Sequence, residues 1–322
     1  MRSAACPPVS LLGNSRNTRP SRCRTICAPC MPGPMPQLPE RLILIHGAWA
    51  GPWVWDALIA ELARHGLPAQ ALALPGDGTH HIPPPKATET DFLQCIVQAI
   101  EAAPGPVALV GHSGGGMLVT AGAEAVPDKV SHGIWIAGML IPDGRSFDDI
   151  QAQIMGPDAR FGITAHVEHS ADGLTSTVPK DMARAYFFND APEPLAVGAA
   201  AQLTCQPRSG HRLRTPTGPR FAALPKLYIH AEHDRSVIPA AQTAMSRSAA
   251  NVTVQPIASG HVPQLTRPAE LAQMMADWLF SRPRSGNPDY DHSAAQAGST
   301  DRAPRKRAQG KSAAPLTTSP RT

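Results

Sequence analysis

The sequence predicts an α/β protein with a mostly parallel sheet flanked by helices and a lid inserted between two core strands. Short apolar runs, typical of strands buried on both faces, alternate with segments of helical spacing. The intervening helices are long enough for parallel β-α-β crossovers. Residues 142–222 break this alternation, carry many Pro and Gly, and form the expected lid, because long inserts of this kind are usually functional.

The elements follow one another along an expected catalytic domain, residues 40–281. The run LILIH at 42–46 is the first strand, and residues 53–65 have helical spacing that ends at Gly66. Further strands are expected at 70–74, 107–111, 133–139, 227–231 and 252–257. Further helices are expected at 90–102, after Gly114, at 240–247 and at 269–280, with helical patches at 180–188 and 194–203 inside the insert.

Charge divides the 322 residues into an acidic middle and two basic ends. The formal net charge is +4, yet residues 1–39 and residues 282–322 each carry +5, which leaves −6 for the rest. Both ends have compositions typical of disorder, and the leader has neither a secretory signal nor more than a faint likeness to a transit peptide. One hypothesis is that translation begins at Met31 or Met35. No apolar run approaches membrane-spanning length.

Cysteines and basic residues add no second function. Cys23, Cys27 and Cys30 have an iron–sulfur spacing, but chance spacing in a tail explains it better because no supporting structure surrounds them. The isolated Cys95 and Cys205 fit a reducing cytoplasm. The dense basic cluster at 305–307 lacks interleaved aromatics, so we expect no nucleic-acid and no membrane partner.

The segment GHSGG at 111–115 carries the chemistry. It follows an apolar strand and precedes a helix of small residues, the context in which G-x-S-x-G presents a nucleophilic serine on a sharp turn. A phosphate-binding loop is excluded because no Lys follows and G-x-G-x-x-G is absent. Ser113 is therefore the predicted nucleophile.

A serine needs a base and an orienting acid, in the chain order Ser, acid, His. Asp234 and His261 each follow one of the two last strands, so we expect them to meet above Ser113. Asp143 is the better alternative acid. Two residues next to Asp234 are also candidates: Glu232 as an acid and His233 as a histidine.

The backbone amides of Ala48 and Gly114 are the predicted oxyanion hole, because the first strand ends beside the serine turn. His46 is expected to be a hydrogen-bonded structural residue. The pair His80-His81 suggests a metal only superficially, since adjacent side chains point apart and no third ligand is placed, so we expect neither metal nor cofactor.

Four motifs give the chain a resemblance to the α/β-hydrolase superfamily over residues 40–281. They are LILIHGAWAGPWVWDAL, GHSGGG, LYIHAEHDRSVIP and SGHVPQLTRPAEL. The first is similar to the branch that holds plant methylesterases, hydroxynitrile lyases and bacterial esterases of the pyrethroid-hydrolase type. The resemblance implies a triad of Ser113, Asp234 and His261, with Ala48 and Gly114 as oxyanion donors.

The resemblance also separates reaction types. The lyases carry a Lys after the catalytic His and a Thr after the entry His, where this chain has Val262 and Gly47, so lyase activity is disfavoured. We expect a carboxylesterase, acting as monomer or homodimer in the cytoplasm on small or medium hydrophobic esters; a non-catalytic ligand receptor is the alternative. The expected substrate contacts are aromatic side chains: Trp49, Phe161, Tyr186 and Phe187.

Overall fold

A computed structural model describes residues 38–141, 143–156 and 159–281. The leader up to residue 37, with its three closely spaced cysteines and candidate start codons, and the basic tail from residue 282 lie outside the described residues. No helix in the described ranges is long and apolar enough to cross a lipid bilayer.

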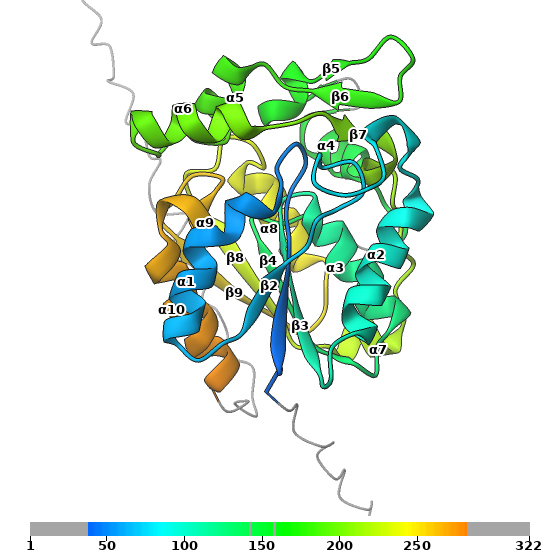
Figure 1. The fold of residues 1–322 in the computed structure, drawn as a ribbon, viewed down its shortest axis with the longest axis vertical. Coiled ribbons are helices and arrows are strands. Elements are labelled where there is room, and N and C mark those ends of the chain that lie inside the picture. Colours follow the sequence, from blue (N-terminus) through cyan, green and yellow to red (C-terminus); the bar gives the residue numbers. More distant parts are fainter. Residues whose placement is uncertain (1–37, 142, 157–158, 282–322) are drawn as a thin grey trace, which may run out of the picture. The chain divides into compact units, whose positions relative to one another are not determined.

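A six-stranded parallel sheet forms the centre, in the order β2-β1-β3-β4-β8-β9 (Figure 1). Its strands are β1 (Arg41–Ile45), β2 (Ala69–Ala71), β3 (Val107–His112), β4 (Val130–Ile136), β8 (Lys226–Ala231) and β9 (Val252–Ile257). Every residue of β3 is buried, as expected for a strand covered on both faces.

Helices cover both faces, because alternate residues of each strand point to opposite sides of the sheet. Leu42 and Leu44 of β1 pack in one hydrophobic cluster with α1 (Asp56–Arg64) and α10 (Pro268–Phe280). Ile43 and Ile45 pack in the other cluster with residues of the insert and with three helices outside it. These are α2 (Glu89–Glu101), α3 (Gly115–Ala125) and α8 (Pro239–Arg247).

Three predicted elements have clearly different bounds. The strand expected at 70–74 is β2, which ends at Ala71. The strand expected at 133–139 is β4, which ends at Ile136 because Ala137 has a φ of 43° and turns the chain out of the sheet. The amide of Met139 then donates to the carbonyl of Ser113 (2.8 Å). The segment expected as one helix at 53–65 begins as a 3-10 turn, η1 (Pro52–Trp55), before α1.

The insert between β4 and β8 forms a cap, defined here as residues 143–156 and 159–223. The helical patches expected there correspond to α5 (Lys180–Tyr186) and α6 (Glu193–Gln202). Figure 1 shows both helices above the edge of the sheet at which β1 ends. The cap also contains elements that the sequence did not predict: α4 (Phe147–Met155), α7 (Pro219–Ala223) and a small antiparallel sheet of β5 (Glu168–His169), β6 (Thr175–Thr177) and β7 (Gln206–Pro207).

Short helical turns complete the chain. They are η2 (Pro84–Lys86), η3 (Gly162–His166), η4 (Arg208–His211) and α9 (Pro263–Thr266).

Candidate active site

Ser113 lies on the turn between β3 and α3. Its φ of 51° is left-handed, a conformation that is strained for a residue with a side chain. Gly111 permits the close approach of strand and helix, because a Cβ there would lie 2.6 Å from Val119 Cγ2 and 2.7 Å from the carbonyl oxygen of Gly115. The turn therefore holds the serine hydroxyl at the amino end of α3.

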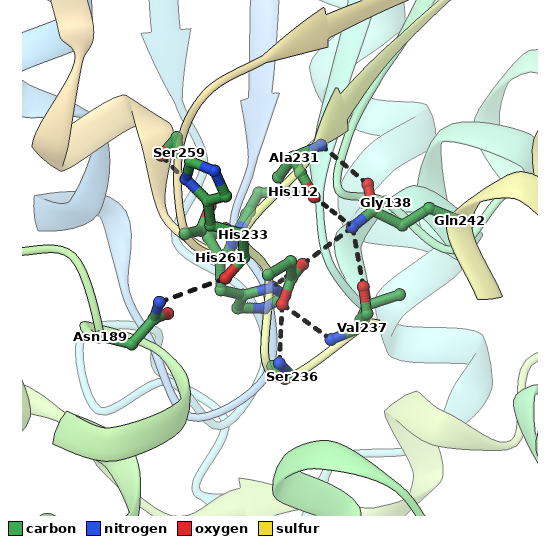
Figure 2. A network of polar contacts seen from close by, with 12 residues as sticks. His112, Gly138, Asn189, Ala231, His233, Ser236, Val237, Gln242, Ser259 and His261 are labelled. Atoms are coloured by element: carbon green, nitrogen blue, oxygen red, sulfur yellow. Dashed lines mark hydrogen bonds and ion pairs between the residues drawn. The ribbon is translucent and has the colours of Figure 1, made fainter. Parts of the chain in front are cut away.

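His261 and Asp234 form a buried pair, with 2.7 Å between Nδ1 and Oδ2. Asp234 is 3% exposed, and its Oδ1 accepts from the amides of Ser236 (2.7 Å) and Val237 (3.0 Å). Gln242 donates to Oδ2 (3.2 Å) and also to the carbonyls of Ala231 and Val237 (Figure 2). These donors fix the carboxylate so that it faces the imidazole.

Ser113 and His261 line one cavity at the end of the sheet. Its volume is about 20 Å³, room for a water-sized molecule, so a larger ligand requires its walls to move. The walls are otherwise mostly apolar or backbone: Gly47, Ala48, Ala50, Trp53, Val54, His112, Phe187, Phe188, Leu203 and Val262.

The backbone nitrogen of Ala48 lies close to Gly114. A Cβ placed on Gly114 would be 3.8 Å from the nitrogen of Ala48. Within the part of the chain that the structure describes, neither amide donates to a protein acceptor. The cap holds the adjoining loop at Trp49, whose amide donates to Gln206 Oε1 (3.1 Å) and whose carbonyl accepts from Thr204 (2.9 Å). Two amides close to Ser113 thus remain available as hydrogen-bond donors.

His112 is buried and holds the loop that carries His261. Its Nε2 lies 2.8 Å from the carbonyl oxygen of His261. Burial, together with the nearby His261, lowers the pKa of His112 well below its usual value. The imidazole is therefore neutral at ordinary pH, and Nε2 carries the proton because its partner can only accept.

His46 is hydrogen-bonded, as expected of a structural residue. Its Nδ1 lies 2.9 Å from the carbonyl oxygen of Gly47, and its Nε2 lies 3.4 Å from Asp77 Oδ2.

The alternative residues are exposed, in contrast to the buried Asp234 and His261. Asp143 is exposed and accepts from the amide (3.2 Å) and hydroxyl (2.6 Å) of Thr217, which lower the pKa of its carboxyl. Glu232 and His233 are exposed. The rings of His80 and His81 lie 4.2 Å apart, so the expectation that these adjacent side chains point apart was wrong. Among the described residues, no group of three or more His, Cys, Asp or Glu side chains could hold a metal ion.

Of the four aromatic residues expected to contact substrate, Phe187 lines the cavity. Its ring stacks on His261, with 5.3 Å between centroids and 23° between planes. The other three do not line the cavity, although the ring of Trp49 lies 5.9 Å from that of Phe187. Trp49 Nε1 donates to the carbonyl of Ser176 (3.2 Å), Tyr186 Oη pairs with His166 (3.0 Å), and Phe161 packs edge-on against Phe147.

Sequence reasoning did not select Val54, Phe188 and Leu203 as cavity residues. Phe188 could have been selected, since it directly follows Phe187, which the sequence did indicate as a substrate contact. Leu203 had none, because it ends a helix without a marked apolar face and reaches the cavity through the placement of the cap.

A parallel α/β sheet with a strained serine at the end of one strand, β3, and a His–Asp pair after two further strands, β8 and β9, defines the α/β hydrolase class of protein. The chain belongs to the alpha/beta hydrolase family, whose model matches residues 42–274.

Several esterases and hydrolases are similar to the chain. Putative methylesterase 12, chloroplastic, from Arabidopsis thaliana is 24% identical over 74% of this chain and 71% of its own length. Esterase PIR7B from Oryza sativa subsp. japonica is 26% identical over 73% of this chain and 94% of its own length. The crystal structure of a pyrethroid hydrolase from Sphingobium faniae JZ-2 matches with a TM-score of 0.64 and 25% identity, covering 74% of this chain and 96% of that one.

Proposed function

We propose that this protein is a serine esterase that cleaves small or medium hydrophobic carboxylic esters through an acyl-enzyme intermediate. The observation that carries the proposal is the buried His261–Asp234 pair, 2.7 Å apart, on the cavity that Ser113 also lines. A serine hydroxyl is a weak nucleophile until a neighbouring base removes its proton, and this pair supplies a base with a fixed orientation.

The proposed acylation uses each nitrogen of His261 for a different task. Nδ1 keeps its proton and donates a hydrogen bond to Asp234, which leaves Nε2 free to take the proton of Ser113 as the serine oxygen attacks the ester carbonyl. The amides of Ala48 and Gly114 stabilise the negative oxygen of the tetrahedral intermediate. As the intermediate collapses, His261 donates its new proton to the departing alcohol, and the acyl group stays on Ser113.

Deacylation repeats these steps with water as the nucleophile. His261 takes a proton from the water, the hydroxide attacks the acyl-enzyme, and the proton returns to the Ser113 oxygen as the carboxylic acid leaves. No cofactor or metal enters the proposed reaction.

Support for a hydrophobic substrate comes from the cavity walls and from the relatives. Ala50, Trp53, Val54, Phe188 and Leu203 present apolar groups, which bind apolar substituents through loss of water contact. The similar proteins carry the names methylesterase, esterase and pyrethroid hydrolase. We place the catalytic domain at residues 40–281 and the protein in the cytoplasm, where Cys95 and Cys205 would remain the free thiols that they are here.

Lyase chemistry is disfavoured by two positions beside the cavity. A Cβ on Gly47 would lie 2.8 Å from Ser113 Cβ, so the site has no room for the hydroxyl-bearing residue of the lyases. Val262 is buried and neutral and offers no charge to a leaving anion.

The test combines a fluorophosphonate probe with a panel of aryl and alkyl esters. We expect the wild type to be labelled and to hydrolyse hydrophobic esters, and the Ser113→Ala variant to do neither. Ser209→Ala is the matched control, because that hydroxyl bonds to the carbonyl of Ala87 and does not line the cavity. Equal labelling of wild type and Ser113→Ala would refute the proposal. Release of cyanide from a cyanohydrin without ester hydrolysis would favour a lyase, and ligand binding without turnover would favour a receptor.

A further inference from the structure

We propose that Asp190, a residue of the cap, is a positioning residue for His261. This inference rests on the esterase function proposed above. In this proposal the cap does more than cover the cavity, because it also fixes the position of His261.

The carboxylate of Asp190 holds the loop that carries His261. Its Oδ2 accepts from the amide of Gly260 (2.7 Å), the hydroxyl of Ser259 (3.1 Å) and the hydroxyl of Thr266 (3.3 Å). Gly260 and Ser259 immediately precede His261, and Thr266 follows it by five residues. One ionisable oxygen therefore ties both sides of the loop to the cap, and hydrogen bonds to a charged acceptor are stronger than neutral ones.

The preceding residue reaches the loop of the acid. Asn189 Nδ2 donates to the carbonyl of His233 (3.1 Å), the neighbour of Asp234, as Figure 2 shows. The amide of His233 in turn donates to the carbonyl of Ser259 (2.9 Å). The dipeptide 189–190 thus contacts both the loop of Asp234 and the loop of His261. The relative position of these loops determines the His–Asp hydrogen bond.

The atoms around this contact are closely packed. A Cβ on Gly260 would lie 2.5 Å from Asp190 Oδ1 and 2.7 Å from Asn189 Oδ1. Phe187, whose ring stacks on His261, lies only three residues before Asp190. A four-residue piece of the cap therefore covers the imidazole and fixes the backbone beside it.

His112 and Asp190 hold the same loop from opposite parts of the molecule. His112, on the core, bonds to the carbonyl of His261, and Asp190, on the cap, accepts the amide of the residue before it. Without Asp190 the core contact remains, so the loop stays attached but can shift. A displacement of about 1 Å at a catalytic group can cost roughly 100-fold in rate.

The experiment compares Asp190→Ala and Asp190→Asn with Asp172→Ala. Asp172 is the matched control: it is an exposed cap carboxylate that also accepts from a hydroxyl, Ser170 (2.6 Å), and an amide, Leu174 (2.9 Å), but it contacts no catalytic loop. Two quantities are measured: the kinetic constants kcat and KM for one aryl ester, and the low-field proton resonance of the His261–Asp234 hydrogen bond.

We expect Asp190→Ala to lower kcat by about 10- to 100-fold with KM within about threefold, and to shift or broaden the resonance. Asp190→Asn should recover part of the loss, because its remaining oxygen can accept the Gly260 amide. Asp172→Ala should change neither quantity.

An unchanged kcat and an unchanged resonance in folded Asp190→Ala would overturn the proposal. Equal losses in Asp172→Ala would also overturn it, since the effect would then be general destabilisation of the cap. Failure of the proposed function is a separate result, in which the wild type itself neither hydrolyses esters nor reacts with the fluorophosphonate. The proton resonance would then still decide whether Asp190 positions His261.

Discussion

The core and the cap contribute to the candidate site in different ways. The core supplies Ser113, Asp234 and His261 at the ends of its strands, and backbone amides or buried side chains hold each of them. The cap supplies Phe187 as a wall of the cavity and, in our proposal, Asp190 as a brace. Substitutions in the core should therefore change the rate of the chemical step or the stability of the fold. Most substitutions in the cap should change which ester is bound.

The largest expected effect is that of Asp234→Asn in the core. An amide cannot hold the imidazole in the required tautomer or stabilise its charge, so kcat should fall by about 10²- to 10⁴-fold with little change in KM. Steady-state kinetics on an activated ester measures this effect. Asp143→Asn is the control and should leave kcat unchanged, because that carboxylate is exposed and bonds to Thr217. Unchanged turnover in Asp234→Asn together with a loss in Asp143→Asn would reassign the acid.

The second effect is a pH-dependent loss of core stability. Burial lowers the pKa of His132, on β4, from 6.5 to about 4, and the residue is 7% exposed. Between about pH 6.5 and 4 the unfolded chain binds a proton that the folded chain does not, so the free energy of unfolding falls as pH falls, by at most about 3 kcal/mol.

Urea unfolding at several pH values between 4 and 6.5 gives the slope of the free energy of unfolding against pH, and we compare this slope in three proteins. His132→Gln should reduce the slope relative to the wild type, while His169→Gln, an exposed site in the cap, should keep it. Equal slopes in wild type and His132→Gln would show that His132 is not the group responsible.

The smallest effect is expected for Phe187→Ala in the cap. Loss of a stacked aromatic pair costs about 0.5–1.5 kcal/mol beyond area burial, so kcat/KM for an aryl ester should fall by roughly 2- to 12-fold. The wider cavity should at the same time favour bulkier esters. Comparing kcat/KM over a series of acyl lengths tests this, with Phe161→Ala as the control that should keep the wild-type order of preference because Phe161 does not line the cavity. If Phe187→Ala left the preference among acyl lengths unchanged, Phe187 would not determine which ester is bound.

The sequence was informative wherever local pattern determines structure. The parallel strands have continuous apolar runs, and GHSGG lies between a strand and a helix, so the fold class and the placement of Ser113, Asp234 and His261 at strand ends could be predicted. The end of β4 could not, because contacts with the serine turn and the left-handed Ala137, not hydrophobicity, decide where that strand stops.

The cap was harder to predict for a physical reason. Strands of two or three residues, such as β5, β6 and β7, are too short to show a period. The helix α4 did have a signal, the capping box between Ser146 and Asp149. Leu203 and Asp190 come to the site only through tertiary packing, which no local pattern records.

Detection of the acyl-enzyme tests the central claim most directly. The wild type is mixed with an activated ester, quenched during turnover, digested and analysed by mass spectrometry. We expect one acyl group per chain, located on Ser113. Turnover accompanied by an acyl group on another residue, or with none accumulating on Ser113 even when deacylation is slowed by a bulky acyl group, would contradict the assignment of Ser113 as the nucleophile.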